Sequence, residues 1–260
     1  MKISVVCPTY NSAKFIENTL TSILNQTETP HELIISDDGS EDNTIQFINN
    51  FLSSSHQKIS YKILQNKHKG PGATRNAGIL DSTGDWIAFI DSDDIWYPEK
   101  ISHVKNLINR NKDINFICHN EMLVNKNNRK SIMRYSKKFN VNKPLFDQLY
   151  ISNLFSTSAV VCKKKLLINS GLFDETLMSA QDYELWLRLA PNVNVLFDEN
   201  ILGEYIVRDG NITSSGLFKR FKNELKIAKK YSKHFKLQKF FKRVVVLLLS
   251  YCKQFVQKWI

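Results

Sequence analysis

The chain has 260 residues, 42% of them hydrophobic, and carries a formal net charge of +11. This length and apolar content suit one α/β domain with an appendage and exclude a largely disordered chain. The charge is uneven, because residues 219–260 hold 13 of the 36 Lys and Arg but only one of the 25 Asp and Glu.

The first 110 residues alternate between two sequence periods. Apolar, β-branched runs at residues 3–7, 33–36, 59–64 and 86–90 predict buried parallel strands. Between them, apolar residues recur at helical spacing, for example Phe15, Ile16, Leu20, Ile23 and Leu24. The sequence therefore predicts an α/β fold with a Rossmann-like, mostly parallel sheet flanked by helices.

The later residues give weaker signals. Residues 112–145 are polar and rich in Asn and Lys, and we expect irregular strands and a loop there. Three further runs predict strands, at residues 158–162, 193–197 and 202–207, and residues 181–190 predict a helix. Residues 216–260 predict a basic, amphipathic, helical tail.

The N-terminus and the cysteines bear on the cellular compartment. The N-terminal apolar run ends at Pro8 and is too short for a signal peptide, which predicts a cytoplasmic protein. Cys7, Cys118, Cys162 and Cys252 are far apart and form no C-x-x-C pair. We expect buried free thiols and no zinc or redox site.

Polar residues follow three of the predicted strands. They are Pro8-Thr9-Tyr10-Asn11, Asp37-Asp38-Gly39-Ser40 and Asp91-Ser92-Asp93-Asp94. The ligand crevice of an open α/β sheet lies beyond the carboxyl ends of its strands. We therefore expect these three loops to meet at one crevice.

The acidic turn at residues 91–94 is the motif that bears most directly on function. Its three carboxylates repel one another unless a cation neutralises them. Hard oxygen ligands suit Mg²⁺ or Mn²⁺ carrying a diphosphate. The alternative is a solvated acidic turn, and the four residues alone do not decide between the two.

Two other segments also allow two interpretations. The loop with Asp37 and Asp38 either leads into a helix cap or accepts hydrogen bonds from a base or a ribose. Residues 70–78 are either an ordinary glycine-rich helix start or a place where backbone approaches a ligand and Arg75 offers a forked donor to phosphate. The latter segment matches neither a dinucleotide fingerprint nor a P-loop.

Five motifs occur in an order that resembles glycosyltransferase family 2. They are Val5-Val6-Cys7-Pro8-Thr9-Tyr10-Asn11, Asp37-Asp38-Gly39-Ser40, Arg75-Asn76-Ala77-Gly78, Asp91-Ser92-Asp93-Asp94 and Gln181-Asp182-Tyr183-Glu184-Leu185-Trp186-Leu187-Arg188. The resemblance covers roughly residues 1–210. It implies a GT-A domain at 1–215, with a nucleotide-binding half at 1–110 and an acceptor half at 111–215, followed by the tail.

The resemblance assigns roles around the nucleotide. It implies that Pro8, Tyr10 and Asp38 form the wall of the nucleobase pocket, with Asp38 accepting a hydrogen bond from the base and Tyr10 stacking on it. Arg75 matches the residue that packs near the base and the diphosphate.

The acidic turn receives divided roles in the same way. Asp91 matches the carboxylate that faces the ribose, and Asp93 matches the one that binds the metal, Mn²⁺ or Mg²⁺. Ser92 belongs to the same nucleotide-sugar-binding turn, and Asp94 is expected to orient the acceptor or the donor sugar.

Asp182 matches the catalytic base of the family. An inverting transfer needs a carboxylate on the face of the anomeric carbon opposite the leaving nucleotide. Asp182 opens a predicted helix whose apolar side would be buried, which would aim the carboxylate rigidly. The alternative for this residue is a plain helix N-cap.

Two departures from the family pattern concern the base and the metal. Gln181 stands where the family usually has an acidic residue, beside the expected base. Residues 205–211 resemble a late motif that often contains a histidine, but they contain none, so a third protein ligand for the metal is in doubt. Asp209 is a candidate substitute, and a solvated turn is the alternative.

The resemblance implies an inverting enzyme that transfers a sugar from a nucleoside-diphosphate sugar, first of all a UDP-sugar. The expected acceptor is a saccharide or a polyprenyl-linked saccharide in bacterial surface polysaccharide synthesis, whether O-antigen, capsule or lipooligosaccharide. The basic tail predicts peripheral contact with the inner leaflet of the cytoplasmic membrane, or a helix that packs back on the domain.

Two rival functions are a nucleotidyltransferase and a nucleic-acid-binding protein that acts through the tail. The first would be expected to show a glycine-rich, lysine-bearing loop after the first strand, where this chain has Pro8-Thr9-Tyr10-Asn11-Ser12. The second would need basic residues on the body, which is nearly neutral. We therefore expect no nucleic acid partner.

Overall fold

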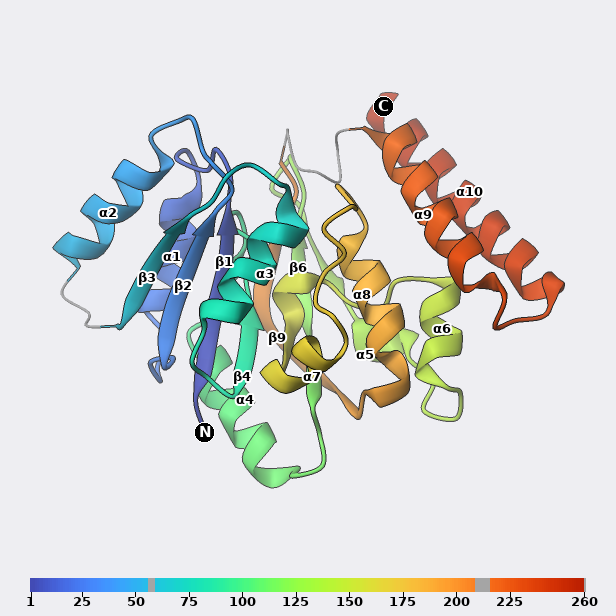
Figure 1. Cartoon of the computed structure of the whole chain (residues 1–260), viewed down its shortest axis with the longest axis horizontal. Helices are drawn as coiled ribbons and strands as arrows, with labels where there is room; N and C mark the ends of the chain where they lie inside the picture. The colour runs from blue at the N-terminus through green and yellow to red at the C-terminus, as the bar shows by residue number, and fades with distance from the viewer. Residues whose placement is uncertain (56–58, 209–215, 260) are drawn as a thin grey trace.

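The computed structural model describes residues 1–55, 59–208 and 216–259, with side chains described as far as residue 252. The described strands form one sheet, and helices lie on both of its faces (Figure 1). The first elements are β1 (Ile3–Thr9), α1 (Ile16–Leu24), β2 (Glu32–Asp37), α2 (Thr44–Ser54), β3 (Tyr61–Gln65), α3 (Pro71–Asp81), β4 (Trp86–Phe89), β5 (Ile95–Trp96) and α4 (Lys100–Arg110). They are followed by β6 (Phe116–Val124), β7 (Lys130–Met133), α5 (Tyr135–Lys138), α6 (Leu145–Ile151), β8 (Val160–Lys163), α7 (Lys164–Asn169), α8 (Gln181–Leu189), β9 (Val195–Ile206), α9 (Leu217–Ser232) and α10 (Leu237–Trp259).

The strands pair in the order β3-β2-β1-β4-β8-β6-β9-β5, and β7 pairs with β6. The first four strands of this order are parallel, as their apolar runs predicted. Strand β8 is antiparallel to both β4 and β6, β9 is parallel to β6, and β5 is antiparallel to β9. The α/β class is confirmed, and the pairs β4–β8 and β5–β9 join the two expected halves of the domain in one sheet.

The sheet separates two apolar clusters, because neighbouring residues of a strand point to opposite faces. Val5 belongs to the cluster covered by α1, α2 and α4, whereas Val6 belongs to the cluster covered by α3, α6, α8 and α9. All seven residues of β1 are buried, as expected of a central parallel strand covered on both faces.

Helix α3 lies unusually close to β1. A Cβ atom on Gly78 would come within 2.7 Å of Val6 Cγ1, so only glycine allows this approach. The helix begins after Gly70, whose φ of 90° lies in the left-handed region, and Pro71 occupies the first helical position. These residues hold the start of α3 beside the ends of β1 and β2.

The second half differs from expectation at two places. The polar segment 112–145 contains strands, as expected, but β6 is a nine-residue strand in the interior of the sheet whose polar residues His119, Asn120 and Glu121 are buried. The expected strands at 193–197 and 202–207 form one strand, β9, with an irregular register opposite Asn120. The Asn120 amide donates to Glu199 O at 2.8 Å, which satisfies one carbonyl group of this irregular backbone.

The tail and the cysteines complete the fold. Residues from 217 onward form two helices, as predicted, and α9 packs on α8 and α10 on α6 and α9 (Figure 1). Cys7, Cys118 and Cys162 are buried free thiols, but Cys252 is exposed, so the expectation of burial was wrong for that residue. Among the described residues, no helix combines the length and the apolarity needed to cross a bilayer.

Candidate functional site

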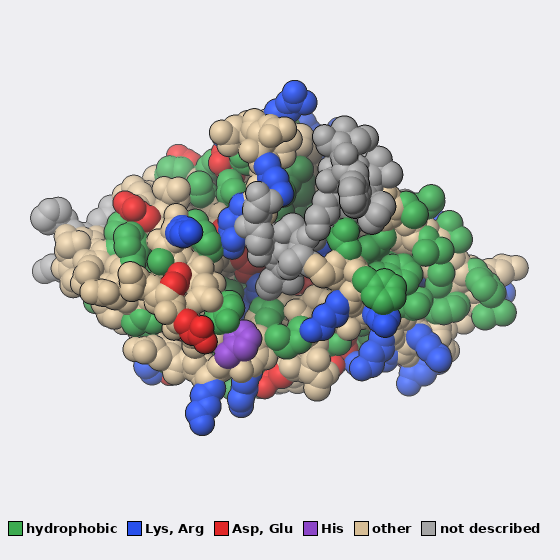
Figure 2. Space-filling model, turned by 90° about the horizontal axis from the view of Figure 1, so that it is seen from above, with side chains coloured by type: hydrophobic (Ala, Val, Ile, Leu, Met, Phe, Trp, Pro, Cys, Tyr) green, Lys and Arg blue, Asp and Glu red, His purple; other side chains and the backbone are tan. Residues whose placement is uncertain are grey.

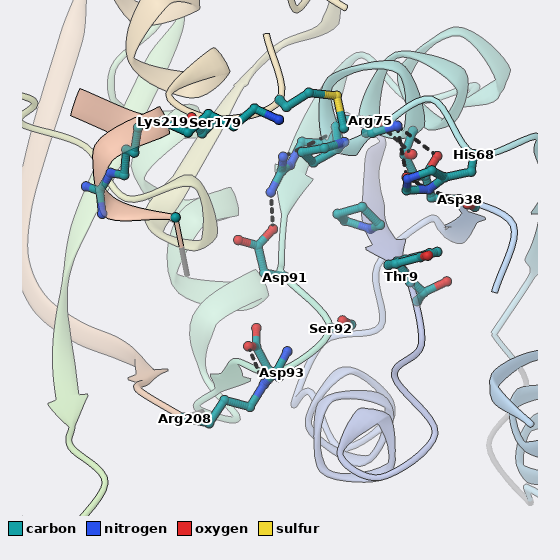
Figure 3. A pocket seen from close by; sticks show the side chains of 18 of the residues that line it. Thr9, Asp38, His68, Arg75, Asp91, Ser92, Asp93, Ser179, Arg208 and Lys219 are labelled. Atoms are coloured by element: carbon teal, nitrogen blue, oxygen red, sulfur yellow. Dashed lines mark hydrogen bonds and ion pairs between the residues drawn. The ribbon is translucent and has the colours of Figure 1, made fainter. Parts of the chain in front are cut away.

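The loops at the carboxyl ends of β1, β2 and β4 meet at one cavity of about 430 Å³ (Figure 3). Seven residues expected from the sequence line it: Pro8, Tyr10, Asp38, Arg75, Asp91, Ser92 and Asp93. The wall is completed by residues from the loop before α3, from the end of β9 and from the start of α9. The three predicted loops therefore share one crevice.

At one end of this cavity, Asp38 is held by backbone and by a histidine. Its carboxylate accepts hydrogen bonds from the N–H groups of Lys69 at 2.8 Å and Gly70 at 3.0 Å. His68 Nδ1 lies 2.9 Å from Asp38 Oδ2, and the His68 ring stacks on Tyr10 with centroids 4.6 Å apart. Tyr10 is 44% exposed, so a flat aromatic surface and a fixed carboxylate face the cavity together.

Arg75 and Asp91 form an ion pair in the middle of the cavity. The distance from Arg75 Nη2 to Asp91 Oδ1 is 2.5 Å, and the arginine side chain is only 6% exposed (Figure 3). Its guanidinium also lies over the Phe173 ring at 5.7 Å. Arg75 is therefore fixed by packing, and it presents a positive charge next to the acidic turn.

Asp93 is paired with a second arginine. Arg208, which follows β9, donates from Nε to Asp93 Oδ2 at 2.8 Å, and its guanidinium lies 3.7 Å from the centre of the Phe15 ring (Figure 3). Burial and the neighbouring Asp91 raise the pKa of Asp93, while Arg208 acts in the opposite direction. The turn therefore favours a cation at Asp93.

Asp94 differs from its neighbours, because it does not line the cavity. It is 2% exposed, and its carboxylate accepts from Ser158 Oγ at 2.5 Å and from the Ile206 N–H at 3.0 Å. Thr19 Oγ1 donates to the carbonyl oxygens of both Ser92 and Asp94. Burial raises the pKa of Asp94 well above its ordinary value, and Asp93, Glu121 and Asp91 add to this. These contacts make Asp94 an anchor of the turn.

A second cavity of about 420 Å³ adjoins the first. Arg75, Asp91, Ser179, Tyr205 and Arg220 line both cavities. The second cavity contains Asp182, the expected base, together with residues of β7, of the segment that follows α6 and of the tail. Two compartments therefore meet at the Arg75–Asp91 pair.

Asp182 is the second residue of α8, so it is not the N-cap of that helix, a position held by Ala180. Tyr183, Leu185, Trp186, Leu187 and Leu189 of the same helix are buried and fix its orientation. Asn153 Nδ2 donates to Asp182 Oδ2 at 3.3 Å. Burial raises the pKa of Asp182 above its ordinary value, which suits a general base that works near neutral pH.

The helical tail contributes side chains to both cavities. Lys219 and Arg220 of α9 line the first cavity, and Arg220 with Arg243 and Ser250 of α10 lines the second. Arg243 is 3% exposed and pairs with Glu224 at 2.8 Å. The tail is therefore part of the site as well as of the surface.

Several residues of the site were missed by the reasoning from sequence. His68, Lys219 and Arg220 carried no motif, and Arg208 stood in a segment noted only for its lack of a histidine. The proximity of Arg208 to Asp93 comes from the long β9 strand, which delivers residue 208 to the end of β4. Asp209, the candidate substitute ligand in that segment, lies outside the described residues.

The donor set suits a divalent cation only in part. Within residues 1–55, 59–208 and 216–252, no three His, Cys, Asp or Glu side chains converge on a point. Asp91 and Asp93 are nevertheless two hard oxygen donors on the cavity wall. Mg²⁺ is commonly held by one or two carboxylates, with the remaining positions taken by phosphate oxygens and water, and these residues fit that arrangement.

Comparison with known proteins identifies relatives of this chain. The family model described as glycosyl transferase family 2 matches residues 4–173. An uncharacterized glycosyltransferase of Rickettsia typhi is 32% identical over 221 residues, which cover 83% of this chain and 67% of that protein. The Escherichia coli UDP-Glc:alpha-D-GlcNAc-diphosphoundecaprenol beta-1,3-glucosyltransferase is 29% identical over 225 residues, which cover 85% of this chain and 83% of that protein.

Solved structures show the same architecture. Staphylococcus aureus TarS 1-349 in complex with UDP-GlcNAc superposes with a TM-score of 0.71 at 24% identity, covering 95% of this chain and 72% of that one. A mannosyltransferase from Pyrobaculum calidifontis in complex with GDP-Man and Mn²⁺ gives a TM-score of 0.71 at 15% identity, covering 98% and 74%. At these identities the likeness concerns the fold.

Proposed function

Since this chain belongs to glycosyltransferase family 2 and has the GT-A fold, we propose that it is an inverting enzyme that transfers a sugar from a UDP-sugar to a saccharide or lipid-linked saccharide. One observation carries the proposal: the cavity containing Asp38, Arg75 and Asp93 adjoins a second cavity that contains Asp182. A donor and an acceptor can thus meet at a shared boundary. Membership of this family also decides against a nucleotidyltransferase.

The donor nucleotide fits the first cavity by its chemistry. The exposed Tyr10 ring offers a stacking surface for a base, beside Pro8 and the fixed Asp38 carboxylate, which can accept a base N–H. Asp91 is the carboxylate that would face the ribose, and Arg75 the cation beside the diphosphate. Ser92 and Asp94 support this arrangement from within the turn: Ser92 Oγ lies 2.9 Å from Ser12 Oγ, and the Asp94 carboxylate is bonded to Ser158.

Asp93 is the proposed protein ligand of a divalent cation, Mn²⁺ or Mg²⁺. Its position on the cavity wall beside Asp91 supports this, as does the Mn²⁺ in the complex of the Pyrobaculum mannosyltransferase. Such an ion would stabilise negative charge on the leaving diphosphate. Arg75 supplies a fixed positive charge from the protein for the same purpose.

Asp182 is the proposed base. The acceptor hydroxyl oxygen forms a bond to the anomeric carbon of the donor sugar, and Asp182 takes the hydroxyl proton. The bond from that carbon to the diphosphate oxygen breaks, so the nucleoside diphosphate leaves with the electron pair and the configuration inverts. Asn153 holds the carboxylate from one side, and the buried face of α8 holds its backbone.

The acceptor cavity is bounded by a helix with two different faces. Arg243 and Leu247 of α10 are buried and line the cavity. Five other side chains of α10 form an exposed apolar stripe: Leu237, Phe241, Val245, Leu248 and Leu249. Figure 2 shows hydrophobic side chains gathered at the end of the molecule formed by α9 and α10, with basic side chains beside them.

This stripe supports attachment to an anionic membrane surface, the inner leaflet of the cytoplasmic membrane. An acceptor carried on a membrane lipid would then enter a cavity whose wall is the membrane-facing helix. The E. coli relative is named for a diphosphoundecaprenol-linked acceptor, which agrees with this arrangement. We therefore propose a role in bacterial surface polysaccharide synthesis, in O-antigen, capsule or lipooligosaccharide.

The proposal is tested by screening nucleotide sugars for hydrolysis and transfer with Mn²⁺ or Mg²⁺. Asp182→Asn should keep donor binding, measured by calorimetry, and lose about 10²- to 10⁴-fold in rate, because the proton then lacks an acceptor. Asp93→Ala should lose the metal-dependent part of donor binding. Transfer by Asp182→Asn at the normal rate would show that another group is the base.

A further inference from the structure

Asp93 already has a cation in this structure, the guanidinium of Arg208. We propose that Arg208 is an exchangeable counter-ion, which occupies Asp93 while no divalent cation is bound there and gives way to that cation when it binds. The inference rests on the metal site proposed above. It adds that the chain itself competes with the metal for the carboxylate.

The geometry explains why the two cations exclude each other. Arg208 Nε is 2.8 Å from Asp93 Oδ2, within the range of a charge-assisted hydrogen bond. The Asp93 side chain is only 14% exposed, so little of it remains accessible to a second ligand. A metal ion needs direct contact with a carboxylate oxygen, and two positive charges on one carboxylate repel each other.

Asp93 also needs a partner whenever the site is empty. It lies beside Asp91 in a turn whose third carboxylate, Asp94, is buried. An unpaired carboxylate there would face like charges with little water to screen them. Arg208 removes that penalty without any bound ion, which explains a basic residue at this position of the chain.

The two arginines of the site differ in how tightly they are held. Arg75 is 6% exposed and its guanidinium lies over Phe173, whereas Arg208 is 31% exposed and its guanidinium lies over Phe15. A long side chain that is partly exposed can change rotamer more readily than one that is fully buried. Once displaced from Asp93, the Arg208 guanidinium can reach into the cavity that it lines and pair with a diphosphate.

The test measures Mn²⁺ binding directly, by electron paramagnetic resonance of the free ion, on the full chain without donor. Arg208→Ala should bind Mn²⁺ about three- to tenfold more tightly than the parent protein, because the competing partly buried ion pair is removed. Phe15→Leu, which keeps the charge but removes the ring beneath the guanidinium, should shift the affinity in the same direction by less. Thermal melts establish that each variant is folded.

Lys219→Ala is the matched control, since Lys219 also places a positive charge on the wall of this cavity but is not the partner of Asp93. An equal gain in Mn²⁺ affinity for Lys219→Ala would mean general electrostatic repulsion and would overturn the exchange, as would an unchanged affinity in Arg208→Ala. Asp93→Asn should abolish binding in both backgrounds. If neither the parent nor Arg208→Ala binds Mn²⁺, the exchange and the metal site fail together, whereas binding that Arg208→Ala leaves unaltered refutes the exchange alone.

Discussion

The carboxyl group of Asp182 links burial to the pH dependence of the reaction. Burial raises its pKa above the ordinary value, and the charge of Asp91 acts in the same direction, while the Tyr183 backbone N–H, Arg75 and Arg220 oppose it. A base works only when deprotonated, and a raised pKa keeps the proton on at higher pH. We expect kcat/KM to fall about tenfold per pH unit on an acid limb that lies above the pH at which an ordinary aspartate titrates.

A pH–rate profile of the parent enzyme and of Asn153→Ala checks this prediction. Asn153 donates a hydrogen bond to the charged carboxylate, so its loss should move the acid limb to higher pH. Donor affinity should be unaffected, because Asn153 lines only the acceptor cavity. An acid limb at the ordinary aspartate pKa would contradict the role of Asp182 as the titrating base.

For individual residues, the sequence predicted which strand-end loops meet at the site, but not which residues from distant parts of the chain join them. Pro8, Asp38 and Asp91 could be predicted to meet because the ends of parallel strands share one edge of the sheet. Asp94 could not be separated from Asp93 by sequence, because the inward turn of its carboxylate depends on Ser158 and Ile206. His68 and Arg208 reach the site through the length of a loop and of a strand, which no local pattern records.

Among the secondary-structure elements, α8 and α9 are joined by hydrogen bonds to one buried carboxylate as well as by apolar packing. Glu184 is 1% exposed and accepts hydrogen bonds from Arg188, Lys230 and Tyr231 at distances of 2.7 to 2.8 Å. Burial disfavours the charged form of Glu184, but the hydrogen bonds from these three donors favour it more strongly, so the pKa of Glu184 is lowered. The helix that supplies Lys219 and Arg220 to the site is therefore held by a polar network.

Glu184→Gln should lower the free energy of unfolding by about 1–3 kcal/mol at pH 7, because charged donors lose an ionised partner. A carboxyl group whose pKa is lower in the folded than in the unfolded state stabilises the fold above its unfolded pKa, which is about 4.5 for Glu184. This stabilisation is lost as the pH falls through the pKa of the folded state. The difference between Glu184→Gln and the parent should therefore shrink towards pH 4. Urea unfolding at both pH values measures it, with exposed Glu17→Gln as the matched control. A constant difference would show that the charge of Glu184 is not what matters.

Whether a strand could be predicted from the sequence depended on where its polar residues lie. The strands β1, β2 and β4 each contain an uninterrupted run of apolar residues and could be recognised from composition. Strand β6 could not, because its buried His119, Asn120 and Glu121 look like surface residues until their partners are known, such as Tyr135 for Glu121. Strand β9 was divided in two because its irregular centre is polar and exposed at Glu199 and Asn200.

At the scale of the whole molecule, the tail has an inner and an outer surface. Ile227, Ala228 and Tyr231 of α9 and Leu247 of α10 are buried, so removing residues 217–260 would expose apolar surface of the body. Point substitutions on the exposed stripe of α10 separate membrane contact from folding. The basic residues and the apolar stripe should contribute in different ways, because only the first are screened by salt.

Phe241→Ser combined with Leu249→Ser should reduce sedimentation with anionic liposomes by at least about tenfold at physiological salt, since two exposed apolar side chains would no longer enter the lipid interface. Leu80→Ser on α3 is the control, because Leu80 and Phe241 are equally exposed, at 58%, on different helices. Replacing Lys236 and Lys242, both exposed beside the stripe, with Gln should weaken binding mainly at low salt.

If Leu80→Ser lowers liposome binding as much as the Phe241→Ser and Leu249→Ser pair does, the surface at the end of α9 and α10 in Figure 2 is not the membrane contact. A parent protein that stays in the supernatant at low salt would refute peripheral attachment while leaving the sugar transfer proposal intact.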